Sequence, residues 1–291
     1  MWSLVGVNNV FKTLCTLTHG QLENKETVTI QILKKAITDY LIKHNPHITY
    51  SNSLKPCIIQ SGHQLIEIIK ILDLEKEIRS HNENNLEAVN KSNLNKLNAA
   101  MKSMQQLNDI YSLFFLSVDT IALTSNIKFA GSATTPEAIG VVWIQPDEHW
   151  SMFDVLESLV HELTHNLLGF DNLVNKHYDK PSEIMNPNTW VPSAIRNQPR
   201  PVNGVAHSII VGIELLNLRN RLNYDDSEVS VHGNSKELIT KTKNAIDSFK
   251  SQRDSWQILS NRMQHLLNLA DESLKHFAYG RIQDEIFPSR T

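Results

Sequence analysis

Residues 154–169, DVLESLVHELTHNLLG, carry the clearest structural signal in this chain. Leucines and valines recur there every three or four residues, which predicts an amphipathic helix. Ser151 or Asp154 is expected to cap the start of the helix, and Gly169 to end it. His161 and His165 fall on one face, only about 40° apart around the helix axis. Two imidazoles so placed suit one transition metal, with Glu162 beside them.

A metal held by this pair needs at least one more protein ligand, and His207 is the strongest candidate. It follows Pro201–Gly204 and lies near the start of a helix expected over about 204–222, with Asn203 as its cap. A ligand in the first turn of a helix is held more firmly than one in a loop. Glu214, on nearly the same face, is the alternative third ligand. His177 is expected to be a solvated loop residue.

Two arginines precede His207 in a segment stiffened by proline. Five of the ten prolines fall between Pro181 and Pro201, so an irregular excursion is expected there. Arg196 and Arg200 lie within it. A guanidinium binds a carboxylate through a bidentate fork, so the pair indicates an acidic small molecule or substrate group beside the metal. Ordinary surface ion pairs are the alternative reading of these two side chains.

The composition limits the class of protein, its binding partners and its cellular compartment. The 291 residues are 41% hydrophobic and 20% charged, as in an ordinary soluble globular protein. A net charge of −3 gives no support to binding of nucleic acid or an anionic membrane through bulk charge. Cys15 and Cys57 have no partner motif, which indicates reduced thiols and a cytoplasmic location. Neither a signal peptide nor a bilayer-spanning stretch is expected.

Three segments are predicted, packed as one compact unit: a helical N-terminal region over 1–118, a metal-site core over 119–223, and a polar loop with a long C-terminal helix over 224–291. Helices are expected at 28–44, 63–80 and 97–116, with a polar, asparagine-rich stretch over 82–98. Short β-branched runs at 120–124 and 140–145 predict strands, and 132–136 a turn between them.

Two of these elements suggest interactions. The strand at 140–145 would offer its edge to an extended peptide. The C-terminal helix carries apolar residues at alternating spacings of three and four, a coiled-coil-like seam. That seam is expected to pack on the protein's own helices, and a homodimer contact is the alternative. Its residues are Ala245, Phe249, Trp256, Leu259, Met263, Leu266, Ala270 and Phe277.

The stretch from Leu159 to Leu216 resembles the HExxH-type 2-oxoglutarate-dependent peptide β-hydroxylases, which tailor ribosomally synthesised, post-translationally modified peptides. Many members carry an acidic residue between the two arginines, where this chain has Asn197 and Gln198. The turn Gly131–Thr134 and the strand Gly140–Gln145 also look like the family. The resemblance rests on three motifs in this order: HELTH at 161–165, SAIRNQPRP at 193–201 and GVAH at 204–207.

The resemblance implies an Fe(II)- and 2-oxoglutarate-dependent dioxygenase that hydroxylates the β-carbon of a side chain in a precursor peptide. His161, His165 and His207 would hold the iron, with positions left open for 2-oxoglutarate and O₂. Arg196 or Arg200 would bind the distal carboxylate of 2-oxoglutarate. An all-histidine set departs from the usual triad with one carboxylate, so Glu162 would orient a ligand or a water molecule.

Two other functions stay open. A zinc metallopeptidase would use the same histidines, or Glu214 as the third ligand, with Glu162 activating water. Peptide hydrolysis does not require the two arginines. A peptide-binding protein with a structural metal would need four protein ligands, and no convincing fourth occurs. The expected fold is α+β and mainly helical, with a zincin-like HExxH helix against a small β-sheet and additional N- and C-terminal helices.

Overall fold

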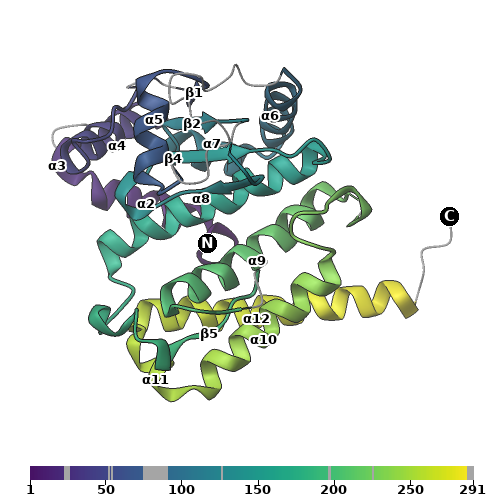
Figure 1. The fold of residues 1–291 in the computed structure, drawn as a ribbon. Helices are drawn as coiled ribbons and strands as arrows, with labels where there is room; N and C mark the ends of the chain where they lie inside the picture. Colours follow the sequence, from purple (N-terminus) through teal and green to yellow (C-terminus); the bar gives the residue numbers. More distant parts are fainter. Residues whose placement is uncertain are drawn as a thin grey trace. The chain divides into compact units, whose positions relative to one another are not determined.

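The computed structural model describes residues 1–22, 27–51, 53, 55–74, 91–125, 127–195, 198–224 and 226–286 (Figure 1). The chain divides into two compact units. The sheet unit is Phe11–Phe170, and the helical unit joins Met1–Val10 to Asp171–Thr291. The protein is mainly helical with a small mixed sheet, in agreement with the α+β prediction. The segment 119–223, predicted as the metal-site core of one compact unit, is shared between the two units.

The sheet unit is built around a four-stranded sheet in the order β1-β2-β4-β3. The first three strands in this order are parallel, and β3 runs antiparallel to β4. β2 and β4 are buried along their whole length, as is usual for parallel strands covered on both faces. The strands are β1 (Cys57–Ile59), β2 (Thr120–Leu123), β3 (Gly131–Ala133) and β4 (Val141–Gln145).

Both predicted strands are confirmed as β2 and β4, but two expectations about their surroundings are wrong. β4 pairs with a strand on either side, so it has no free edge to offer a peptide. The turn expected at 132–136 is replaced at its start by β3, a strand of Gly, Ser and Ala. These residues have low strand propensity, so the pairing with β4 and not the local sequence makes the strand.

The helices of the sheet unit agree with the predicted pattern in part. α4 matches the helix expected at 28–44, and its cap is Thr29, whose Oγ1 accepts a hydrogen bond from the Ile32 amide. The helix expected at 63–80 ends as α5 at Ile71, and residues 75–80 and 82–90 lie outside the described residues. The helix expected at 97–116 is two helices. The bounds are α2 (Val7–Leu17), α3 (His19–Leu22), α4 (Ile30–His44), α5 (His63–Ile71), α6 (Lys91–Met104) and α7 (Asn108–Ser117).

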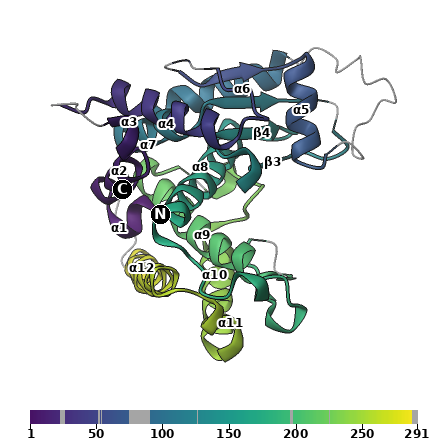
Figure 2. The same ribbon diagram turned by 90° about the vertical axis from the view of Figure 1, so that its left-hand side faces the viewer.

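α8 (Met152–Asn175) contains the HExxH sequence and lies along the sheet (Figure 2). Its capping is confirmed, because the Asp154 amide donates to Ser151 Oγ at 3.0 Å and the Ser151 amide to Asp154 Oδ2 at 2.8 Å. The predicted end at Gly169 is wrong, since the helix continues to Asn175. A Cβ at Gly169 would lie 3.3 Å from the side chain of Ile139, so this glycine allows close packing instead.

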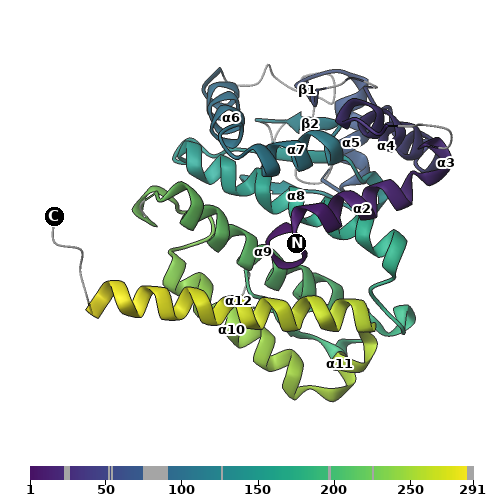
Figure 3. The same ribbon diagram turned by 180° about the vertical axis from the view of Figure 1, so that it is seen from behind.

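The helical unit is organised around α9 (Val202–Leu222), which is buried on nearly all sides. A helix that is apolar all round is a central helix, and α9 contacts α1, α10 and α12 (Figure 3). It begins at Val202 and not at 204, so Asn203 lies inside its first turn and does not cap it. The other elements are α1 (Trp2–Val5), β5 (Val191–Pro192), β6 (Pro199–Arg200), α10 (Ser235–Ser251), α11 (Arg253–Ile258) and α12 (Asn261–Ile286).

The predicted single C-terminal helix is wrong, because three helices occupy this region. The breaks fall at Gln252 and after Ile258. The Gln264 side chain donates to the carbonyls of Trp256 and Leu259 and so satisfies acceptors that the end of α11 leaves open. The prediction that the apolar seam packs on the protein's own helices is confirmed within this unit. Six of its side chains are buried: Ala245, Phe249, Leu259, Met263, Leu266 and Ala270. These side chains are therefore covered without a second copy of the chain.

None of the helices that the structure describes combines the length and the apolar character needed to cross a lipid bilayer. Cys15 and Cys57 are both free thiols and half-buried, as expected from their isolation in the sequence.

Candidate functional site

The structure brings His161 and His165 together on α8. Their Nε2 atoms lie 3.1 Å apart, and their ring centroids 4.9 Å apart. With metal–nitrogen distances of about 2.1 Å, two ligands of one ion stand about 3.0 Å apart in octahedral and about 3.4 Å apart in tetrahedral coordination. The observed distance lies between these values, so the pair fits a transition metal of either geometry. At this distance the rings are also able to share a hydrogen bond.

Asn166 fixes this part of α8 on the sheet through one buried hydrogen bond to the chain before β4 and holds its own side chain with a second bond inside the helix. Asn166 Oδ1 accepts a hydrogen bond from the Gly140 amide at 2.7 Å, and its Nδ2 donates to the Glu162 carbonyl at 3.1 Å. Gly140 directly precedes β4 and has a φ of 89°, a conformation that favours glycine. Asn166 therefore clamps the turn of helix that carries the histidines to the start of β4. Leu159, Leu163 and Leu167 are buried.

Glu162 is almost fully buried, with 2% of its surface exposed. Its Oε1 accepts a hydrogen bond from Ser132 Oγ at 2.7 Å and lies 4.0 Å from His161 Nε2. The carboxylate is thus held between β3 and the histidine pair. Sequence reasoning missed Ser132 because it fell in a predicted turn, and no local pattern marks a residue whose partner is 30 positions away.

The third predicted ligand, His207, belongs to the helical unit. It is half-buried in the second turn of α9, one turn later than expected, because the helix starts at Val202. Arg200 is also half-buried and pairs with Val191 in the short hairpin of β5 and β6. The Ala194 amide donates to Ser208 Oγ at 3.0 Å. This bond ties the arginine segment to α9 beside His207. Arg196 and Asn197 lie outside the described residues.

Glu214, the alternative third ligand, is fully buried in the helical unit. Its Oε1 accepts a hydrogen bond from the Ser3 amide at 3.0 Å, and it forms an ion pair with the amino group of Met1. A carboxylate used in this way stabilises the docking of α1 on α9. That role weakens the case for Glu214 as a metal ligand.

The prediction that His177 is a solvated loop residue is wrong. Its side chain is fully buried, and its Nε2 lies 2.7 Å from Asp171 Oδ2. Arg262 binds the same carboxylate with two hydrogen bonds, from Nε at 2.9 Å and from Nη2 at 2.8 Å. Ser260 donates its amide to the His177 carbonyl at 2.9 Å. The loop after α8 is therefore docked on the start of α12, an arrangement that only long-range packing creates.

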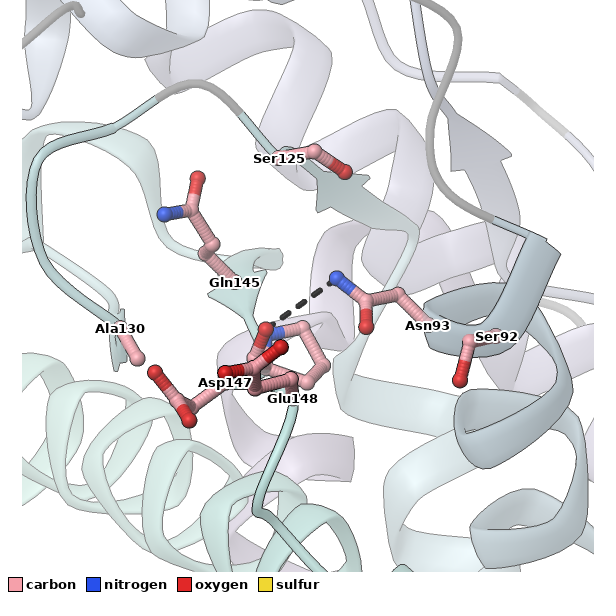
Figure 4. A pocket seen from close by; sticks show the side chains of 8 residues that line it. Ser92, Asn93, Ser125, Ala130, Gln145, Asp147 and Glu148 are labelled. Atoms are coloured by element: carbon pink, nitrogen blue, oxygen red, sulfur yellow. Dashed lines mark hydrogen bonds between the residues drawn. The ribbon is translucent and has the colours of Figure 1, made fainter.

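A separate polar pocket of about 370 Å³ lies where β2 and β4 end at their carboxyl termini (Figure 4). It is bounded by the first turn of α6 and by residues 145–148. Asn93 donates to the Pro146 carbonyl at 3.1 Å, and Lys96 Nζ donates to the carbonyls of Asp147 and Glu148. None of the predicted site residues lines this pocket. It is a polar crevice of the sheet unit, distinct from the histidine pair.

Among the residues that the structure describes, no group of three or more His, Cys, Asp or Glu side chains gathers as a metal site. The predicted ligands thus stand as one close pair in the sheet unit and His207 in the helical unit. No model of a protein family matches the chain, and no curated protein is significantly similar to it. The functional interpretation therefore depends on the chain's own residues.

Proposed function

We propose that this protein is an Fe(II)- and 2-oxoglutarate-dependent dioxygenase that hydroxylates the β-carbon of a side chain in a ribosomally made precursor peptide. The observation that carries the proposal is the approach of His161 Nε2 to His165 Nε2 at 3.1 Å on one turn of α8. Imidazole nitrogen suits iron and zinc, whereas Mg²⁺ and Ca²⁺ prefer oxygen. Bound iron with 2-oxoglutarate and O₂ would supply the oxidising chemistry.

The roles of the protein's own residues follow from their types and positions. His161 and His165 would bind the metal from α8, and His207 would supply the third nitrogen from α9. Arg200, with Arg196, would bind the distal carboxylate of 2-oxoglutarate through a bidentate fork. The hydrogen bond from Ala194 to Ser208 supports this pairing of roles, because it joins the arginine segment to the helix that carries His207.

The same proposal includes a zincin-like arrangement, a cytoplasmic setting and a peptide substrate. A zincin-like arrangement is supported by the packing of the HExxH helix on a small sheet whose last strand, β3, reaches Glu162 through Ser132. A cytoplasmic setting is supported by two unpaired cysteines, Cys15 and Cys57. The substrate would be a peptide, with no role for nucleic acid or a membrane.

A zinc metallopeptidase is the second candidate, and one observation favours it. Glu162 Oε1 lies 4.0 Å from His161 Nε2, close enough for this carboxylate to act on a water molecule beside the histidines. Two features weigh against it. Glu214 is engaged with Ser3 and Met1, which weakens the case for the glutamate-type ligand set. Peptide hydrolysis does not require the two arginines.

Anaerobic titration with Fe(II) and 2-oxoglutarate tests the proposal directly. Joint binding should produce a visible metal-to-ligand absorption band, and His165→Ala should abolish it. Arg200→Ala should weaken the affinity for 2-oxoglutarate by about tenfold or more, as expected for the loss of a charge-assisted hydrogen bond. Arg253→Ala is the matched control, because Arg253 is exposed on α11 of the same unit and should leave the affinity unchanged.

Turnover separates the two candidates. A hydroxylase would form succinate in a peptide-dependent reaction, with a gain of one oxygen in the peptide. Zinc-dependent peptide cleavage that Glu162→Gln abolishes, without succinate formation under any condition, would reject the hydroxylase and establish the peptidase.

A further inference from the structure

We infer that Ser132 is a positioning residue for the candidate metal centre, because its hydroxyl holds one oxygen of Glu162 beside the histidine pair. The inference rests on the proposed function in so far as it requires a metal at His161 and His165. Ser132 is not part of the HExxH pattern, and it lies on β3, a strand that the sequence did not predict.

The geometry gives one oxygen atom two neighbours. Glu162 Oε1 accepts the hydrogen bond of Ser132 at 2.7 Å and lies 4.0 Å from His161 Nε2. A carboxylate oxygen can accept more than one hydrogen bond. A donor bound next to His161 would therefore reach an acceptor whose position is already fixed. Without the hydroxyl, Glu162 would lose a hydrogen bond that helps to fix its rotamer.

Both ends of this hydrogen bond are attached to rigid elements. Ser132 is the central residue of β3 and lies opposite Ile144 of β4. Thr134 Oγ1 donates to the Val141 carbonyl at 2.9 Å and so fastens the chain just after β3. On the other side, Asn166 clamps α8 to Gly140. Rigid attachment of this kind keeps a functional group in place during a reaction. Outer hydrogen-bond partners serve this purpose at metal sites.

A merely structural role is the competing explanation. Ser132 would then satisfy a buried carboxylate and stabilise the contact of β3 with α8, with no effect on what binds at the histidines. The two roles differ in one respect. A positioning residue acts on the metal only through Glu162, so its removal has no further effect on metal binding once Glu162 is absent.

The experiment is a double-mutant cycle read by Co(II) alone, which reports on the ligand set without turnover. Full-length wild type, Ser132→Ala, Glu162→Ala and the double variant are titrated with Co(II), and the d–d absorption and the dissociation constant are measured. Thr134→Val is the matched control, because it removes a hydroxyl hydrogen bond just after β3 that does not involve Glu162. Ser132→Thr restores a hydroxyl at the original position.

We expect Ser132→Ala to weaken Co(II) binding by about three- to tenfold, at or below the lower end for loss of an outer partner, and to shift the d–d bands. In the Glu162→Ala background the same change should alter affinity by less than about twofold. Ser132→Thr should restore the wild-type spectrum, and Thr134→Val should keep it.

The inference is overturned if Ser132→Ala leaves the Co(II) spectrum unchanged, if its effect is equal with and without Glu162, or if Thr134→Val has the same effect. A wild type that binds Co(II) with this cycle but never forms the Fe(II)–2-oxoglutarate band would reject the proposed hydroxylase and leave the role of Ser132 intact.

Discussion

The buried carboxylate of Asp171 should be one of the strongest single contributors to the stability of the helical unit. It is fully buried and accepts hydrogen bonds from Arg262 at 2.8 and 2.9 Å and from Asn175 at 2.9 Å, and it lies 2.7 Å from His177 Nε2. Asp171→Asn removes the charge and turns an N–H group towards one of these donors. Breaking a buried ion pair from one side costs about 3–5 kcal/mol.

The lower end of that range applies, because the Arg262 side chain is 25% exposed and water would partly compensate its lost partner. A loss of about 3 kcal/mol lowers Tm by roughly 6–12 °C in a protein of this size. Asp271→Asn is the control within the same unit. Asp271 pairs with Lys250 at 2.6 Å and Lys243 at 3.5 Å, but these lysines are 37% and 46% exposed. Exposed pairs of this kind contribute about 1 kcal/mol or less.

The pH dependence offers a second test of Asp171. Burial alone would raise the pKa of its carboxyl group, but hydrogen bonds from His177 and Arg262 and their charges outweigh burial and hold the pKa well below its ordinary range. Because the folded pKa lies below the unfolded value of about 3.9, the stabilisation is fully present above about pH 4 and is lost as the pH falls further. Asp171→Asn should flatten that acid limb of the stability curve.

Urea unfolding followed by far-UV circular dichroism, at pH 7 and over pH 2–5, measures both effects. Equal losses of unfolding free energy for Asp171→Asn and Asp271→Asn would refute the reasoning. So would an acid limb of the same steepness in wild type and Asp171→Asn.

Three further predictions concern the sheet unit. His165→Ala should weaken Co(II) binding by more than about 100-fold, which exceeds the effect of losing an outer hydrogen-bond partner. The control His149→Ala, at a side chain 84% exposed, should leave Co(II) binding unchanged. Equal effects of the two substitutions would exclude the histidine pair as ligands. Gly140→Ala should lower the free energy of unfolding by about 1–3 kcal/mol, because φ is 89° and the new Cβ would meet a leucine at 2.8 Å. Gly20→Ala, with open space around it, should cost nothing, so an equal loss of melting temperature would contradict this. Burial lowers the pKa of Lys34 to about 8. Between about pH 8 and pH 10.5 this lysine is therefore protonated in the unfolded chain and neutral in the folded protein, so the free energy of unfolding rises with pH by up to about 3 kcal/mol. Lys34→Met should remove that rise in urea unfolding, and a wild type with no such rise would disprove the assignment.

Elements defined by neighbouring residues were predictable. The start of α8 follows from Ser151 and Asp154, which cap it reciprocally, and α4 from its apolar periodicity and from Pro46 beyond its end. Their hydrogen bonds and apolar faces lie within a few residues of each other, so the local sequence contains the whole signal. The pairing of His161 with His165 belongs to this class, since helix geometry alone brings them together.

Elements that depend on distant partners were not predictable. β3 exists because β4 pairs with it, and Gly169 lies inside α8, where the absence of a side chain leaves room for Ile139. His177 looks like a solvated polar residue in the sequence. Its burial is stabilised by Asp171, which Arg262 binds in turn. The break before α12 depends on Gln264 and on the loop after α8.

The sequence by itself determined the pairing of His161 with His165, the helix that carries them and the α+β class, because each follows from helical spacing and from runs of apolar residues. Only the tertiary structure decided which strand reaches Glu162, which histidine is buried with Asp171 and which carboxylate receives the Ser3 amide. The physical reason is that a buried charge requires a partner, and a partner far along the chain leaves no trace in the local sequence.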